Sequence, residues 1–245
     1  MRKALLALLL LGAACFPHSD SIESLHDDPW AFLGVPNPLH VLYAAALVSG
    51  LAVFYAIFAR FSEEAKKLVF FVIAAPIGLS TIYLGATTVY LNAVSESAGP
   101  VHWHADFEIW ACGEKYELAD PSGLDNKVGS PVVHEHNDNR MHVEGVLLKK
   151  GEASLRNFLI QAGGNFDEDS LTLPTNAGVM SWNDGDLCNG RPARWHVFVN
   201  GEPLGDDAHD YVISPYELVP PGDAIKFVFT EKKPDEVNPD IGGPP

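Results

Sequence analysis

Two long apolar stretches stand out in the N-terminal part of the chain. Residues 39–59 and 68–94 each exceed the roughly 20 residues that a helix needs to cross a bilayer, and neither contains Asp, Glu, Lys or Arg. Two helices buried in a soluble protein would be shorter and would carry a polar stripe on one face. The pattern therefore predicts a hairpin of two transmembrane helices over 39–94.

The positive charges around these stretches indicate how the hairpin is oriented. The connecting loop carries Arg60, Lys66 and Lys67. Segment 15–38 has no Lys or Arg, and the first one after the second stretch is Lys115. Cytoplasmic loops are enriched in Lys and Arg. We therefore predict a multi-pass protein of the cell membrane, with the loop in the cytoplasm and with 15–38 and the C-terminal domain on the extracytoplasmic side.

The first residues of the chain predict a processing signal. Segment 1–14 has a basic start, a short leucine-rich run and small residues before Cys15, which is the layout of a secretory signal peptide. The stretch LGAAC is similar to a bacterial lipobox, although Gly12 stands where an apolar residue is usual. Three outcomes fit these residues: acylation of Cys15 after cleavage, cleavage alone, or an uncleaved anchor.

Beyond residue 100 apolar and polar positions alternate, which is typical of strands with one buried face. In 101–109 Val, Trp, Ala, Phe and Ile occupy one face, while His, Asp and Glu occupy the other. The dipeptide Asn200-Gly201 predicts a tight hairpin turn. The segments with strand patterns are 101–110, 112–118, 194–204 and 223–230.

One helix is predicted among these strands. Ser154 is placed to cap 155–162, whose apolar residues form a stripe, and two glycines follow it. Strands, one helix and further strands predict an α+β domain over 100–231 that is mostly β. A β-grasp-like arrangement, with the helix covering the apolar face, is one topology that fits. Segment 232–245 is rich in Pro, Gly and charge, which predicts disorder.

The charge of the chain limits its partners. The net charge is −16, and from residue 96 onward 26 Asp and Glu stand against 11 Lys and Arg. Nucleic acids and anionic lipid headgroups are poor partners for such a surface, whereas cations are better ones. The predicted partners are therefore a metal ion and the membrane, without nucleic acid.

Two cysteines remain beyond the processing site. Cys112 and Cys188 belong to the predicted extracytoplasmic domain, which lies in an oxidising compartment. A disulfide between them is the natural interpretation. The alternative is a pair of thiolates that bind a metal, which suits an oxidising compartment less well.

Histidines gather in two segments of the domain, HWHADFE (102–108) and HEHNDNRMHVEG (134–145). In a strand, residues i and i+2 project from the same face, about 7 Å apart. Pairs at this spacing would therefore pool their side chains on one side if their strands were neighbours. The candidate ligands are His102, His104, His134, His136 and His142, together with Asp106, Glu108 and Glu144.

These residue types favour one transition-metal ion. Imidazole is the commonest transition-metal ligand, and a His-rich site with carboxylates suits Cu(II), Zn(II) or Ni(II), of which copper or zinc is our expectation. The chain has three Met, which disfavours a Cu(I) carrier. The alternative is a solvated sheet surface whose histidines gather by chance. His196, on a predicted strand, either joins the site or is half buried. The histidines expected to be structural or solvated are His18, His26, His40 and His209.

Segment 102–108 also fits one half of the cupin signature, but the glycine spacings around it do not fit and no second half is present. The stretches HWHADFEIWACGEKYEL, HEHNDNRMHVEG and HVFVNGEPLGD together resemble an uncharacterised family of secreted and membrane-anchored microbial proteins. Its members have an early His-x-His strand, a His-rich segment ending in Ile/Val-x-Glu, a short helix and a VNG hairpin. The resemblance covers about 100–230 and implies the domain and its site, but no assigned activity.

Three functions fit these features. The first is a membrane-anchored extracytoplasmic protein that binds copper or zinc for capture or delivery. The second is a metal-dependent enzyme in which three His ligands leave one position open and Glu108, Glu135 or Glu144 is the base. The third is a structural or adhesion module with a stabilising metal. No G-x-S-x-G or comparable nucleophile motif adds weight to the enzyme.

Overall fold

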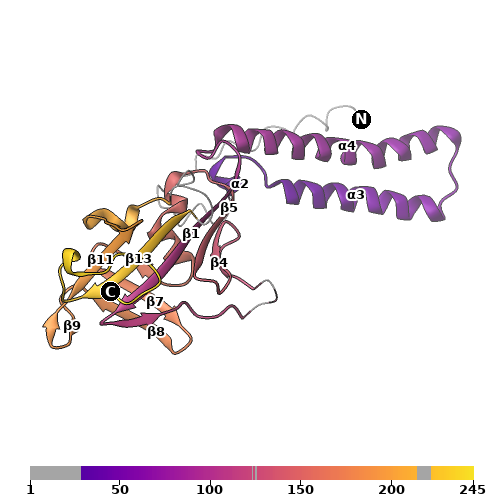
Figure 1. Ribbon diagram of the computed structural model, residues 1–245. Helices are drawn as coiled ribbons and strands as arrows, with labels where there is room; N and C mark the ends of the chain where they lie inside the picture. Colours follow the sequence, from indigo (N-terminus) through magenta and orange to yellow (C-terminus); the bar gives the residue numbers. More distant parts are fainter. Residues whose placement is uncertain (1–28, 123, 125, 214–221) are drawn as a thin grey trace.

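The computed structural model of the protein shows two long helices that extend from a β-rich domain (Figure 1). It describes residues 29–122, 124, 126–213 and 222–245. The predicted signal peptide 1–14 and the candidate lipidation site Cys15 lie outside the described residues, as does most of 15–38. A short helix, α2 (Pro29–Phe32), begins the described part.

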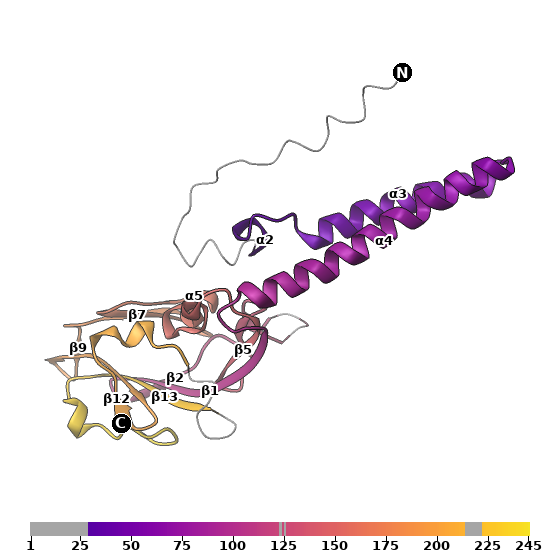
Figure 2. The same ribbon diagram turned by 90° about the horizontal axis from the view of Figure 1, so that it is seen from above.

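The two apolar stretches form the helices α3 (Pro38–Phe58) and α4 (Glu63–Val94), which confirms the prediction of two helices here. Both are long and apolar enough to cross a membrane. They lie side by side and run in opposite directions (Figures 1 and 2). Their large apolar side chains are mostly exposed, which in water would be unfavourable and in lipid is not.

Polar groups fix the ends and the register of this hairpin. The Asn37 side chain accepts a hydrogen bond from the N–H of Leu39 at the start of α3, and Ser62 caps α4. Between the helices, the Ser49 hydroxyl donates to the Ile73 carbonyl at 3.1 Å. These bonds satisfy groups that would otherwise be unpaired in an apolar environment.

A mixed sheet forms the centre of the β-rich domain. Its long strand β1 (Pro100–Ala111) begins six residues after α4 and runs parallel to β13 (Asp223–Thr230) and antiparallel to β5 (Arg140–Val146). The strand order is β12-β11-β13-β1-β5-β4-β3, with β2 also paired to β1. The remaining strands are β2 (Glu114–Tyr116), β3 (Val128–Gly129), β4 (Val133–Glu135), β11 (Arg194–Val199) and β12 (Glu202–Pro203).

The apolar face of this sheet packs under a short helix, α5 (Leu155–Gln161). The Ser154 side chain accepts a hydrogen bond from the N–H of Asn157, so the predicted cap and helix are confirmed. Phe158 of α5 lies 5.2 Å from Phe107 of β1, measured between ring centroids. The apolar positions of β1 predicted to face the core are buried from residue 105 onward. The domain is thus α+β and mostly β.

Smaller elements surround this core. They are β6 (Asn165–Phe166), β7 (Ser170–Thr175), β8 (Gly178–Asn183), β9 (Leu187–Cys188), β10 (Arg191–Pro192), and the 3-10 turns η1 (Lys150–Ala153), η2 (Asp206–Asp210) and η3 (Pro234–Glu236). Cys112, just after β1, forms a disulfide with Cys188 of β9, and their Cα atoms are 5.2 Å apart. This confirms the disulfide interpretation and ties the β9–β10 hairpin to the main sheet.

The C-terminal segment differs from the expectation. Residues 232–245, for which the composition predicts disorder, fold back along the sheet beside β13. The cause is Lys226, whose side chain is fully buried and whose Nζ donates to the carbonyls of Asn238, Asp240 and Gly243 at 2.7–2.9 Å. A buried ammonium group needs such acceptors, and this segment supplies them.

Candidate metal centre

Three adjacent strands bring the predicted ligands to one face of the sheet. In the β1–β5 pairing, His102 lies opposite Glu144 and His104 lies opposite His142. In the β4–β5 pairing, His134 lies opposite His142 from the other side. Directly opposed residues have Cβ atoms about 4.5–5.5 Å apart, so a row of three imidazoles crosses the three strands. The register, together with the i, i+2 spacing, creates the cluster.

The five predicted histidines form one continuous cluster of rings. The Nε2 atoms of His102 and His104 are 2.8 Å apart. Ring centroids are 4.7 Å apart for His104 and His142, and 4.8 Å apart for His136 and His142. His134 lies 4.7 Å from His136 and 5.6 Å from His142 by the same measure. We refer to these five residues as the histidine cluster.

Three members of the histidine cluster meet the geometric requirement for a shared ion. One ring nitrogen from each of His102, His104 and His142 lies within 4.8 Å of the others. Ligand atoms about 2.0–2.1 Å from a tetrahedral zinc ion are separated by roughly 3.3–3.4 Å. Shifts of about 1 Å or less, within reach of side-chain rotation, would bring the three nitrogens to that spacing. These histidines could therefore hold a metal ion.

Hydrogen bonds around the cluster fix which nitrogens are free. Nδ1 of His136 lies 2.6 Å from the carbonyl oxygen of Asn126, and since a carbonyl only accepts, Nδ1 carries the proton and Nε2 keeps its lone pair. Nε2 of His142 lies 3.2 Å from Oδ2 of Asp138, which leaves Nδ1 of His142 available. Metal-binding histidines generally have such a partner on the second nitrogen. Neither Asp138 nor Asn126 is among the residues that the sequence predicts for the site.

The charge state of Asp138 supports its role as the hydrogen-bond partner of Nε2 of His142. Burial raises the pKa of this carboxyl, but the hydrogen bond and the charge of His142, together with backbone N–H groups, lower it by more, so its pKa lies below the usual value. An ionised Asp138 is an acceptor only and therefore keeps the proton of His142 on Nε2. The sequence signal for this contact is the spacing of four residues between Asp138 and His142 across a turn.

Burial keeps two of the imidazoles neutral. His134 is 1% exposed, and desolvation, followed by the charge of Lys127, lowers its pKa. Desolvation is also the largest cause of the lowered pKa of His104, with further contributions from His142 and His102. Neutral imidazole is the form that binds metal, so the fold favours the ligand-ready state.

His134 also leaves a polar atom unsatisfied. Its buried Nδ1 has no hydrogen-bond partner among the residues that the structure describes. A buried polar atom left in this way costs about 1–3 kcal/mol, and an ion or a proton donor at the cluster would remove that cost. The unpaired atom thus identifies His134 as a group with unused binding capacity.

The predicted carboxylates divide into two groups. Glu144 lies at the cluster, with Oε1 3.5 Å from Nε2 of His102 and Oε2 4.0 Å from Nε2 of His134. Asp106 instead forms an ion pair with Arg140 at 2.6 Å. Glu108 accepts hydrogen bonds from Trp110 and Lys115. Glu144 is therefore brought to the histidines, whereas Asp106 and Glu108 are engaged with cations and donors further along β1.

Two further residues considered in the sequence analysis have structural roles. Glu135 is buried, and its Oε1 accepts hydrogen bonds from the N–H groups of Asp138 and Asn139, which holds the turn between β4 and β5. Nε2 of His196 on β11 lies 3.1 Å from the Lys232 carbonyl. His196 does not join the histidine cluster.

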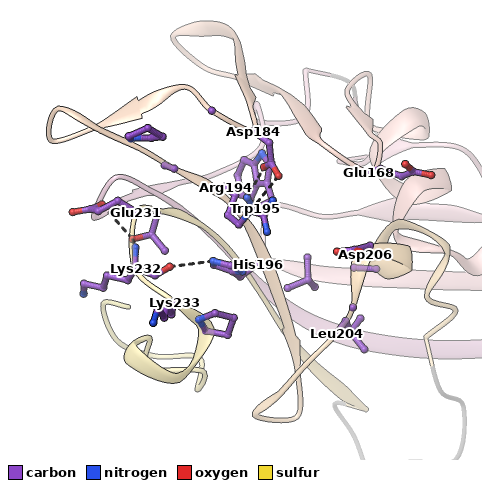
Figure 3. Close-up of a pocket in the computed structure, with 18 of the residues that line it drawn as sticks. Glu168, Asp184, Arg194, Trp195, His196, Leu204, Asp206, Glu231, Lys232 and Lys233 are labelled. Carbon is purple, nitrogen blue, oxygen red and sulfur yellow. Dashed lines mark hydrogen bonds and ion pairs between the residues drawn. The ribbon is translucent and has the colours of Figure 1, made fainter.

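A pocket of about 660 Å³ lies beside His196 (Figure 3). None of the five cluster histidines lines it. Two of its acidic and basic side chains are paired: Asp184 accepts a hydrogen bond from the Trp195 backbone at 2.9 Å and lies 3.6 Å from Arg194. Sequence analysis gave no signal for this pocket, because its walls come from several segments far apart in the chain.

No family model, curated protein or solved structure matches the chain. The resemblance to a family of secreted and membrane-anchored proteins therefore stays a prediction.

Proposed function

We propose that the protein is anchored in a membrane by α3 and α4 and binds Cu(II) or Zn(II) at the histidine cluster, for capture or delivery of the ion. One observation carries this proposal: ring nitrogens of His102, His104 and His142 lie within 4.8 Å of one another on two paired strands. The free lone pairs of His136 and His142 and the neutral state of His104 support it.

The proposed location is the extracytoplasmic side of the cell membrane. Support comes from the loop between α3 and α4, which carries Arg60, Lys66 and Lys67, since Lys and Arg favour the cytoplasmic side. The disulfide between Cys112 and Cys188 supports the same side, because disulfides persist mainly in oxidising compartments. The β-grasp-like interpretation is likewise a proposal, supported by the central parallel pair β1 and β13 beneath α5.

A metal-dependent enzyme is a second candidate, and one observation favours it. The carboxylate of Glu144 lies 3.5 Å from His102 and its side chain is 40% exposed, so it could reach a water molecule on an ion held by the histidines. In that function Glu144 would be the base. Loss of a hydrolytic activity in a Glu144→Gln variant that keeps its metal would favour the enzyme over the carrier.

The test of metal binding uses the full-length protein in detergent, purified with a tag that contains no histidine. The protein is stripped with a chelator, equilibrated with Zn(II) or Cu(II), and separated from free ions by gel filtration. Mass spectrometry of the metal should then find at least one ion per chain. Retention of no ion with either metal would contradict the proposed function.

A further inference from the structure

The histidine cluster contains more ligands than one ion uses. Five imidazoles and the Glu144 carboxylate lie in contact, whereas zinc and copper sites of this type have about four protein or water ligands. The sequence predicted a single ion. The surplus raises the question of whether the remaining ligands form a second site.

The orientation of two rings separates the ligands into two groups. His134 and His142 are stacked, with an angle of 6° between their planes and 5.6 Å between their centroids. An ion bound to imidazole lies in the plane of the ring, along the lone pair of the nitrogen. Two stacked, parallel planes have no such point in common, so His134 and His142 bind different ions in this arrangement. His142 belongs with His102 and His104, which leaves His134 outside that group.

A partner for His134 is already in place. His136 lies 4.7 Å from His134 between ring centroids, and its ring is tilted by 78°, so the two ring planes intersect and one ion can lie in both. The Asn126 carbonyl holds the proton of His136 on Nδ1, which frees Nε2. His134 is 1% exposed, and its Nε2 lies 4.0 Å from Oε2 of Glu144, so Nε2 is the nitrogen of His134 that faces the shared carboxylate.

Glu144 connects the two groups. Its Oε1 faces His102 and its Oε2 faces His134, at 3.5 and 4.0 Å. In paired-metal sites the ions lie about 3.5–4 Å apart, and an anionic bridge offsets their mutual repulsion. The geometry points to a two-ion centre, which rests on the proposed metal-binding function. The first ion is bound by His102, His104 and His142, the second by His134 and His136, and Glu144 supplies one oxygen to each.

This arrangement makes the two positions chemically different. With Glu144, the first ion has four protein ligands, which fills a tetrahedral shell. The second ion has three and keeps one position open to water or to an anionic ligand. The second ion is therefore the one that exchanges or reacts, while the first is held more firmly.

The first experiment measures stoichiometry in the full-length protein. The metal-free protein in detergent is titrated with Zn(II), and ions retained after gel filtration are counted. The two-ion centre predicts two zinc ions per chain, one in His136→Ala and two in the control His196→Gln. One ion in the unaltered protein overturns this inference and leaves the proposed function intact, whereas no ion overturns both. His136 is only half-buried, so its replacement should not prevent folding.

The second experiment tests the bridge with Cu(II). One equivalent should give the electron paramagnetic resonance signal of an isolated ion, and the second should broaden or remove that signal, because neighbouring Cu(II) ions couple. In Glu144→Gln the second equivalent should bind weakly or not at all, because no anionic bridge offsets the repulsion between the ions, so the isolated signal of the first ion should persist when it is added. Two equivalents with uncoupled signals in the unaltered protein, or coupling unchanged in Glu144→Gln, would overturn the two-ion centre.

Discussion

The histidine cluster and the pocket beside His196 lie on different strands of the same sheet, and they differ in what their polar atoms do. The pocket has a volume of about 660 Å³, but Asp184 is bonded to Trp195 and His196 to the Lys232 carbonyl. In the cluster, hydrogen bonds to outer residues leave lone pairs free on His136 and His142. A ligand gains most where it satisfies atoms that the fold leaves unpaired.

The pKa shifts do not distinguish the two regions. Burial is the largest cause of the lowered pKa of His104 and His134 in the cluster, and it is equally the largest cause for His196 at the pocket. All three imidazoles are therefore held neutral. The difference lies in geometry: His104 and His134 have neighbouring ligands within reach of an ion, and His196 has a backbone carbonyl. Neighbouring imidazole nitrogens with free lone pairs thus identify the candidate metal site better than the volume of a pocket or the pKa shift of a histidine does.

The largest expected effect comes from removing two imidazoles of the first group. His104→Ala combined with His142→Ala should reduce zinc affinity at that position by more than the roughly 10–100-fold that loss of one outer partner causes. Competition with a zinc-binding dye measures the change. The matched change at the pocket, His196→Gln, should leave affinity unaltered. Equal losses in the two proteins would remove the distinction between cluster and pocket.

A smaller loss is expected when only an outer partner of the cluster is changed. Asp138→Asn keeps an acceptor for Nε2 of His142 but removes the negative charge that stabilises the bound imidazole, so zinc affinity should fall about 10-fold or more. Asp184→Asn is the control, because it makes the same chemical change in an aspartate of the pocket. If Asp138→Asn binds zinc as tightly as the unaltered protein, Asp138 does not orient a ligand.

When stability is measured without metal, the order of the two variants should be the reverse: Asp184→Asn should lose more unfolding free energy than Asp138→Asn. Asp184 accepts a hydrogen bond from the Trp195 backbone and lies near Arg194, and its loss of charge should cost about 1 kcal/mol of unfolding free energy. Asp138→Asn should cost less, since the Asp138 side chain is 44% exposed. Denaturant melts followed by circular dichroism, with chelator present, test this. A larger loss in Asp138→Asn would mean that the cluster contributes more to stability than the pocket.

The sequence predicted elements and faces well, because these depend on local periodicity. The alternation in 101–109 placed Phe107 in the core and His102 and His104 on the other face, and Ser154 marked the start of α5. Sequence also indicated Cys112 and Cys188 as a disulfide pair, since they are the cysteines that remain after the processing site.

What the sequence could not provide was register and long-range partners. Asp106 and Glu108 share a strand face with His104, but Arg140 and Lys115, brought in by neighbouring strands, engage them. The burial of Lys226 and its bonds to the C-terminal segment likewise depend on where β13 lies in the sheet. Such pairings are set by contacts between distant segments, which local patterns do not encode.

The smallest expected effect concerns the pH dependence of stability at the pocket. Burial lowers the pKa of His196, and the hydrogen bond to the Lys232 carbonyl offsets this only in part. The folded protein therefore keeps His196 neutral at pH values where the unfolded chain, with a pKa of about 6.5, binds a proton. Because the unfolded state then holds more protons, stability contributed by His196 is fully present above pH ~6.5 and is lost as pH falls through the lowered pKa.

His196→Gln tests this, because glutamine keeps an N–H donor for Lys232 and does not titrate. We expect the unfolding free energy of the variant, in chelator, to fall less steeply than that of the unaltered protein as pH is lowered below ~6.5. His104 and His134 titrate in both proteins, so their contributions cancel in the difference. Parallel curves for the two proteins across this window would show that His196 has the same pKa in the folded and unfolded states, and that burial at the pocket does not keep it neutral.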